Sequence, residues 1–185
     1  MKKEIYYFSE SGTENTEKTV ELARKRAKEL NIDEVVVAST HGKTAKRVIN
    51  SFGDENTNIV VVTICEAYSE EGWTMKDQEK KEIEGKGAKV LTCPHTLSAG
   101  IGESLENNSG AEGIVANTLY RFSQGMKVCV EIVLMAADAG LINMNQEVLA
   151  IAGTGNGADT CVVIKPSYTR KFDELEIKEI IAMPR

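Results

Sequence analysis

The sequence of 185 residues has few aromatic side chains, few prolines and fewer basic than acidic residues. Its 22 lysine and arginine residues stand against 28 aspartate and glutamate residues, which gives a net charge of −6. A duplex nucleic-acid binder needs a basic face that neutralises phosphates. We therefore expect no nucleic-acid partner, although a few backbone amides can still hold a small anionic ligand.

The sequence also has no CxxC pair and no cluster of cysteine with histidine. Such clusters are typical of zinc sites and of thioredoxin-like redox centres, so we expect neither, and no metal site. The four cysteines lie in or beside apolar runs, which favours reduced thiols in the core. They are Cys65, Cys93, Cys129 and Cys161.

Long apolar runs are absent as well. Even the stretch from Val128 to Ala137 is interrupted by Glu131 and falls short of a membrane span. The start, Met1 to Glu4, leads into only a short apolar stretch, which predicts no signal peptide. We expect a cytoplasmic protein with no membrane partner. No low-complexity tract or linker divides the chain, so we expect a single domain over residues 1–185.

Apolar β-rich runs alternate with helical patterns through the first half, an order typical of βαβ units and a mostly parallel sheet. Strands are expected at residues 5–8, 35–38, 59–64 and 89–93, and helices at 16–30, 43–52 and 77–84. Ser11 and Glu14 predict a capping box at the start of the first helix. Residues 97–110 are rich in glycine and serine, which predicts a long loop.

The second half predicts two helices, at about residues 111–123 and 126–139. The second helix is apolar almost all round and should be buried. Strands at 148–152 and 160–164 are joined by a short Gly-rich turn, so we expect them to be antiparallel. A last strand is expected at 177–183.

The turn from Ser39 to Thr44 is the strongest candidate for a ligand site. In open parallel sheets, ligands bind beyond the carboxyl ends of the strands, and the first amides of a helix stabilise a phosphate. Gly42 lets the backbone approach a ligand closely, Lys43 supplies a charge, and Thr40 supplies a hydroxyl, as do Ser39 and Thr44. The alternative is a polar turn whose serine or threonine caps the helix.

Two further turns belong to the same edge of the expected sheet. Residues 9–16 are similar to the hydroxyl-rich phosphate loop of flavodoxins, but Glu10 and Glu14 disfavour an anion there. Residues 153–158 match the pattern GxGxxA, yet a strand follows where the dinucleotide motif needs a helix, so we reject a Rossmann site. This Gly-rich turn either lets a flat or extended ligand lie against bare backbone or is a plain hairpin turn.

Several polar and aromatic residues have two interpretations. Glu131 and Asp138 either face a polar pocket, or Glu131 pairs with a lysine and Asp138 caps the end of the helix. Tyr68 and Trp73 either stack on an aromatic ligand or cover the sheet edge. The two histidines are either exposed turn residues or candidates for a general base. They are His41 and His95.

From about Thr16 to Pro166 the order of elements resembles the C-terminal, allosteric domain of pyruvate kinase. Residues 35–45 are similar to the strand and sugar-phosphate effector loop of that domain, and residues 147–163 to its last two strands and Gly-rich loop. The resemblance implies a three-layer α/β/α fold with a mostly parallel sheet and an antiparallel strand near the C-terminus. The catalytic barrel has no counterpart, which predicts no kinase activity.

The whole chain resembles more closely a group of small stand-alone prokaryotic proteins with this fold. Residues 127–131, 135–138 and 176–181 carry that part of the resemblance. It implies FMN as the cofactor. The residues expected to bind FMN are Ser39, Thr40, Gly42, Lys43 and Thr44 at the phosphate, and Thr63, Ser98, Gly155 and Asn156 near the ribityl chain or ring.

The first functional hypothesis is therefore an FMN-binding protein, which could act as a flavin-dependent oxidoreductase. The alternative is a non-catalytic module that senses a sugar phosphate or a nucleotide. A third hypothesis is a flavodoxin-like electron carrier, which would hold the phosphate with Thr13 and Thr16. The sequence names no catalytic residue, no substrate and no electron partner, and it leaves a homo-oligomer open.

Overall fold

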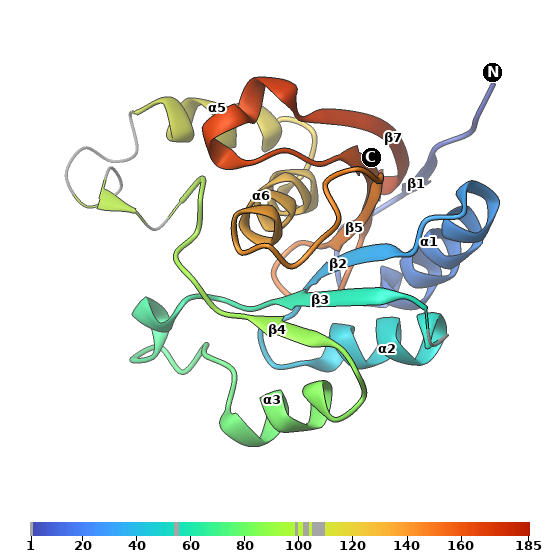
Figure 1. Cartoon of the computed structure of the whole chain (residues 1–185). Coiled ribbons are helices and arrows are strands. Elements are labelled where there is room, and N and C mark those ends of the chain that lie inside the picture. The colour runs from blue at the N-terminus through green and yellow to red at the C-terminus, as the bar shows by residue number, and fades with distance from the viewer. Residues whose placement is uncertain (1, 54–55, 99, 102–103, 105–109) are drawn as a thin grey trace.

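The apolar runs of the sequence form one sheet of seven strands within the part of the chain that the computed structural model describes, residues 2–53, 56–98, 100–101, 104 and 110–185. The order across the sheet is β1-β7-β6-β5-β2-β3-β4 (Figure 1). The strands are β1 (Tyr6–Phe8), β2 (Glu34–Ala38), β3 (Asn58–Val62), β4 (Lys89–Leu91), β5 (Val148–Ala152), β6 (Thr160–Lys165) and β7 (Glu176–Pro184).

The strand directions confirm the expected sheet. β2 pairs in parallel with both β3 and β5, β3 pairs in parallel with β4, and β1 pairs in parallel with β7. β6 is antiparallel to β5 and to β7. The turn between β5 and β6 is too short for the crossover that parallel neighbours need, so β6 has to return in the opposite direction. The fold is α/β with a mostly parallel sheet and an antiparallel strand near the C-terminus.

Helices cover both faces of the sheet, which makes the three layers (Figure 1). They are α1 (Thr16–Leu30), α2 (Lys43–Phe52), α3 (Asp77–Glu84), α5 (Ala111–Leu119) and α6 (Gln124–Asp138), with 3-10 turns η1 (Thr13–Asn15), η2 (Glu66–Tyr68) and η3 (Thr169–Glu174). Side chains alternate along each strand. Val36 of β2 therefore packs with α6, whereas its neighbours Val35 and Val37 pack with α1 and α2.

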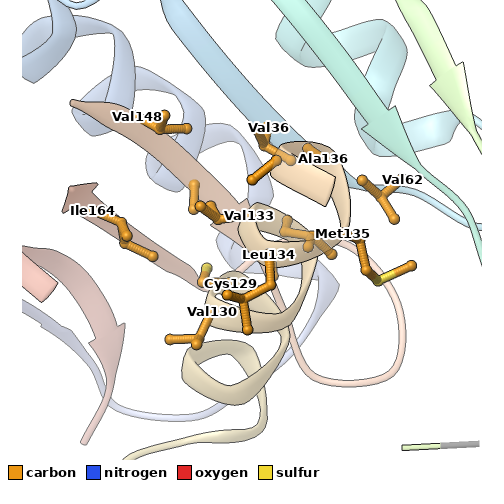
Figure 2. Packing of buried hydrophobic residues seen from close by; sticks show 14 of the residues in the cluster. Val36, Val62, Cys129, Val130, Val133, Leu134, Met135, Ala136, Val148 and Ile164 are labelled. Carbon is orange, nitrogen blue, oxygen red and sulfur yellow. The ribbon is translucent and has the colours of Figure 1, made fainter. Parts of the chain in front are cut away.

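Helix α6 is buried along nearly its whole length, as its sequence predicts. Cys129 and Val133 are completely buried and pack with β-strand residues such as Val36 and Ile164, as Figure 2 shows. Burying apolar area at roughly 25 cal/mol per Å² is the main favourable contribution to such a core. The two charged residues of this helix that are also buried, Lys127 and Glu131, lie outside this apolar packing and are described with the site below.

The bounds of α1 match the expected 16–30, but the turn before the helix differs from the prediction. The helix begins at Thr16, its N-cap Asn15 makes no side-chain cap, and η1 precedes it, so the capping box of Ser11 and Glu14 is wrong. Gly12 instead has a non-helical φ of +138°, and its amide donates to the distant Asp159 carboxylate at 3.2 Å. The expected loop at 97–110 lies largely outside the described residues.

Among the described residues, every helix is too short or too polar to cross a membrane.

Candidate functional site

A cleft of about 970 Å³ opens at the carboxyl edge of the sheet. Because all the strands except β6 run in the same direction, the turns that follow β1, β2, β3, β4 and β5 meet at this edge. The turn after β2 and the Gly-rich turn after β5 both line the cleft, together with one side of α6 between Gln124 and Met135. Two segments that are far apart in the sequence thus lie at one concave surface.

The start of α2 presents unused donors to the cleft. None of the described residues accepts a hydrogen bond from the amide N–H of Lys43 or Thr44. The N-cap of α2 is Gly42, which has no capping side chain, but the Ser39 hydroxyl accepts from the amide of Ala45 in the first turn at 3.2 Å. The positive end of the helix dipole therefore faces the cleft with two backbone donors.

Lys43 differs from the other cations of this helix. Lys46 pairs with Glu82 at 2.7 Å and Arg47 pairs with Glu17 at 2.8 Å. Lys43 is exposed and lines the cleft, and no carboxylate within the described part of the chain pairs with it. Its charge is therefore available to an anion at the helix start.

His41 lies beside this helix start and contacts α3. Its Nδ1 is 3.3 Å from a carboxylate oxygen of Glu79, and the amide of Lys76 donates to the same oxygen at 2.8 Å. The Lys76 amide, and then His41, hold the pKa of Glu79 below its usual value. This contact fixes the imidazole at the rim of the cleft.

Gly42 is required by packing as well as by backbone conformation. Its φ is +76°, in the left-handed region, and a Cβ added there would lie 2.8 Å from Cδ1 of Ile83. The expected reason for this glycine, close approach of a ligand, is therefore incomplete, because α3 already occupies the adjacent space. Gly42 is not among the residues that line the cleft.

Gly42→Ala should lower the free energy of unfolding by about 2–3 kcal/mol, since a left-handed alanine and an overpacked Ile83 each destabilise the fold. Gly140→Ala is the matched control, because Gly140 has φ +67° and nothing within 4 Å of the added Cβ. The control should lose only about 1 kcal/mol. Urea unfolding measures both, and equal losses would show that the Ile83 contact has no effect.

The Gly-rich turn has an inner part and an outer part. A Cβ at Gly157 would meet Oγ1 of Thr16 at 2.5 Å, and the amide of Thr154 donates to Asp159 at 3.1 Å. Gly155 and Asn156 are exposed, and both line the cleft. The outer part therefore offers bare backbone to a ligand, whereas the inner part is used by the protein.

A buried ion pair lies at the floor of the cleft. Lys127 Nζ is 2.5 Å from the Glu131 carboxylate, and both residues are 3% exposed. Lys127 also donates to the Ser98 hydroxyl at 2.8 Å, and Glu131 accepts from Ser98 at 3.1 Å and from the amide of Leu97 at 2.8 Å. Ser98 lines the cleft, but its hydroxyl serves this network.

Thr63 and Asp138 have structural contacts of their own. Thr63 is almost completely buried, and its hydroxyl lies 2.7 Å from that of Thr92. Asp138 accepts from the amide of Thr169 at 3.1 Å, so it holds η3 rather than the end of its own helix.

Burial raises the pKa of the Cys93 thiol, and the nearby Cys65 raises it further. No group of three metal-ligating side chains occurs among the described residues.

The structure brings most of the expected FMN residues to one cleft. Its lining includes Ser39, Thr40, Lys43, Thr44, Thr63, Ser98, Gly155 and Asn156. The interpretation that Glu131 pairs with a lysine is confirmed, although sequence reasoning did not identify Lys127 as that lysine, and it missed Asp159. The spacing of Lys127 and Glu131 by four residues in an apolar helix is a signal for a buried pair, whereas no local pattern marks Asp159.

Solved structures of pyruvate kinase from Cryptosporidium parvum align with the chain at low similarity. One is 14% identical over 82% of this chain, with a TM-score of 0.40, and a second is 17% identical over 80%, with a TM-score of 0.41. The chain spans only 22% of each of those chains. The model of the pyruvate kinase alpha/beta domain family matches residues 17–164. The match extends over most of the 185 residues, and the chain belongs to the pyruvate kinase alpha/beta domain family.

Proposed function

We propose that this protein binds FMN in the cleft, with the phosphate at the start of α2. One observation carries the proposal: the unused amides of Lys43 and Thr44 and the open backbone of Gly155 line the same concave surface. A phosphate is stabilised by helix-start amides together with a cation. Asp159 lies under the Gly-rich turn and disfavours a phosphate on that side.

The size of the cleft fits a mononucleotide. Its volume of about 970 Å³ is at the upper end of the roughly 300–1,000 Å³ that small-molecule sites occupy. The cleft is lined by the turns that follow β5, β2 and β3 and by His95, which follows β4. These four strands are consecutive neighbours in the sheet. Three strand spacings correspond to about 14 Å. An elongated ligand that places its phosphate at the start of α2 and extends along the sheet edge matches this length.

Bound FMN would supply hydride or electron transfer, and a flavin-dependent oxidoreductase is the corresponding activity. The residues of this chain would bind and orient the ligand. Lys43 and Thr44 would hold the phosphate, and Gly155 and Asn156 would contact the sugar chain next to it, which leaves the direction of the ring open. We assign no catalytic residue.

A module that senses a sugar phosphate or a nucleotide is the second candidate. The donors at α2 recognise a phosphate, and nothing among them selects a flavin over another phosphorylated ligand. A flavodoxin-like carrier is disfavoured. Thr13 donates to the carbonyl of Asn156 at 3.2 Å, and Thr16 is buried and donates to the carbonyl of Thr13 at 2.6 Å.

Lys43→Ala should weaken FMN binding by about tenfold, because it removes one charge-assisted contact of about 1.5 kcal/mol. Quenching of flavin fluorescence, or calorimetry, measures the dissociation constant. Lys80→Ala is the matched control, because Lys80 is an exposed lysine on α3 that does not line the cleft. The control should bind FMN like the wild type.

Three outcomes separate the candidates. Loss of FMN affinity in Lys43→Ala but not in Lys80→Ala supports the proposal. Thermal stabilisation of the wild type by sugar phosphates but not by FMN supports the sensor. Equal FMN affinity in the wild type and Lys43→Ala contradicts a phosphate at the start of α2.

A further inference from the structure

Three aromatic rings from two loops form a continuous stack beside the cleft. The rings of Trp73 and Tyr68 lie 5.7 Å apart at 20°, and those of Tyr68 and His95 lie 6.2 Å apart at 25°. Tyr68 and Trp73 follow β3, whereas His95 follows β4. Of the three, His95 lines the cleft and Trp73 is 51% exposed. We call Trp73, Tyr68 and His95 the ring stack.

The ring stack is separate from the hydrophobic core. Neither core cluster includes Tyr68 or Trp73. Ordering large side chains in loops is entropically unfavourable, and a half-exposed tryptophan recovers little of this through burial. Stacked rings do, however, hold a neighbouring ring in a fixed orientation. The stack therefore orients His95 at the wall of the cleft.

We propose that the ring stack is the subsite for a planar heteroaromatic ring of the ligand, with His95 as the residue that contacts it. This inference rests on the proposed phosphate position at α2. The strands β2, β3 and β4 are neighbours, so the turn after β4 lies two strand spacings, about 10 Å, from the turn after β2. An extended five-carbon sugar alcohol, counted from the phosphate at one end into the ring at the other, extends over a comparable length. The phosphate and the ring of one ligand can thus occupy the two turns.

The chemistry that fits this subsite is a phosphorylated sugar or sugar alcohol that carries a flat ring. Flavin and purine rings share this chemistry, and both stack on aromatic side chains. The ligand could also extend from the phosphate in the opposite direction, toward the Gly-rich turn after β5. Its ring would then lie on the backbone of Gly155. A test must therefore separate the contribution of the ring to affinity from that of the phosphate. It must also distinguish a ring at His95 from a ring at Gly155.

The experiment measures binding of four probes: FMN and AMP, and their ringless counterparts ribitol 5-phosphate and ribose 5-phosphate. His95→Ala should weaken binding of the ring-bearing ligand by about 5- to 150-fold and leave its ringless counterpart unchanged. His95→Phe should retain the affinity, because it keeps a flat face. His95→Leu, which keeps the bulk without that face, should behave like His95→Ala.

The outcomes distinguish this inference from the proposed function. Equal losses for ringed and ringless probes, or no loss for either, overturn the ring subsite while phosphate binding stands. A ring-specific loss in Gly155→Val but not in His95→Ala places the ring on the Gly-rich turn and also overturns it. If the wild type binds none of the four probes, both proposals fail. Whether FMN or AMP shows the ring-specific loss identifies the ring. The melting temperature of each variant establishes that it is folded.

Discussion

Glu131→Ala should lower the free energy of unfolding by about 3–5 kcal/mol, because it leaves the Lys127 ammonium buried without its counter-charge. Lys127 is 3% exposed, and its ammonium also donates to the Ser98 hydroxyl and lies 5.8 Å from the centre of the Tyr120 ring, neither of which supplies a negative charge. The variant also removes the acceptor of the Leu97 amide. Urea unfolding at neutral pH, followed by circular dichroism, measures the change.

The double variant Lys127→Met/Glu131→Leu separates the charge from the packing. Removing both charges together leaves no isolated ion, so this protein should be more stable than Glu131→Ala. Glu176→Ala is the matched surface control, because Glu176 pairs with the exposed Lys165 at 2.7 Å. That change should have little effect on stability. A double variant as unstable as the single one would show that lost packing, and not the orphaned charge, causes the loss.

Asp159→Ala should lower the free energy of unfolding by about 3–4 kcal/mol, because three donors lose a charged acceptor. Asp159 is completely buried. Its carboxylate accepts from the amides of Gly12 and Thr154 and from the hydroxyl of Thr160. Hydrogen exchange of the Gly12 and Thr154 amides should also become faster, since these bonds tie the loop after β1 to the Gly-rich turn.

Asp138→Ala is the control for Asp159→Ala. Asp138 accepts from one exposed amide, that of Thr169, so its removal should lower stability by about 1 kcal/mol or less. Asp159→Asn should be intermediate, because its amide keeps one acceptor oxygen and turns a donor toward the remaining N–H groups. A loss in Asp159→Ala no larger than in Asp138→Ala would contradict a central role for this carboxylate.

Local pattern predicts most elements of this fold. The bounds of α2 and α3 match the expected 43–52 and 77–84, because their stop signals, glycines at 53 and 85, lie in the sequence. The bounds of α1 also match the expected 16–30, but the turn before this helix does not have the predicted capping box. Ser11 and Glu14 have the spacing of a capping box, but Asp159, distant in sequence, fixes the Gly12 amide instead. Tertiary contacts of this kind leave no trace in a local window.

The candidate site is predictable only in part for the same reason. The rule for parallel sheets places the turns after β2 and β5 at one edge from the sequence alone. The burial of Thr63 and the ring stack depend on side chains that pack across separate turns. Which hydroxyls remain available to a ligand could therefore not be predicted.

The contact of Ile83 with Gly42 links two equilibria. Ile83 is the buried residue of α3, and it packs against the backbone just before the amides of Lys43 and Thr44. Local opening of α3 would release this backbone, so an anion that fixes the amides must also favour the closed form of α3. By thermodynamic reciprocity, any partner that holds α3 in place strengthens anion binding by the same factor. With a phosphate bound as proposed, the short helix α3 would be a point from which affinity at the cleft can be adjusted without touching the ligand.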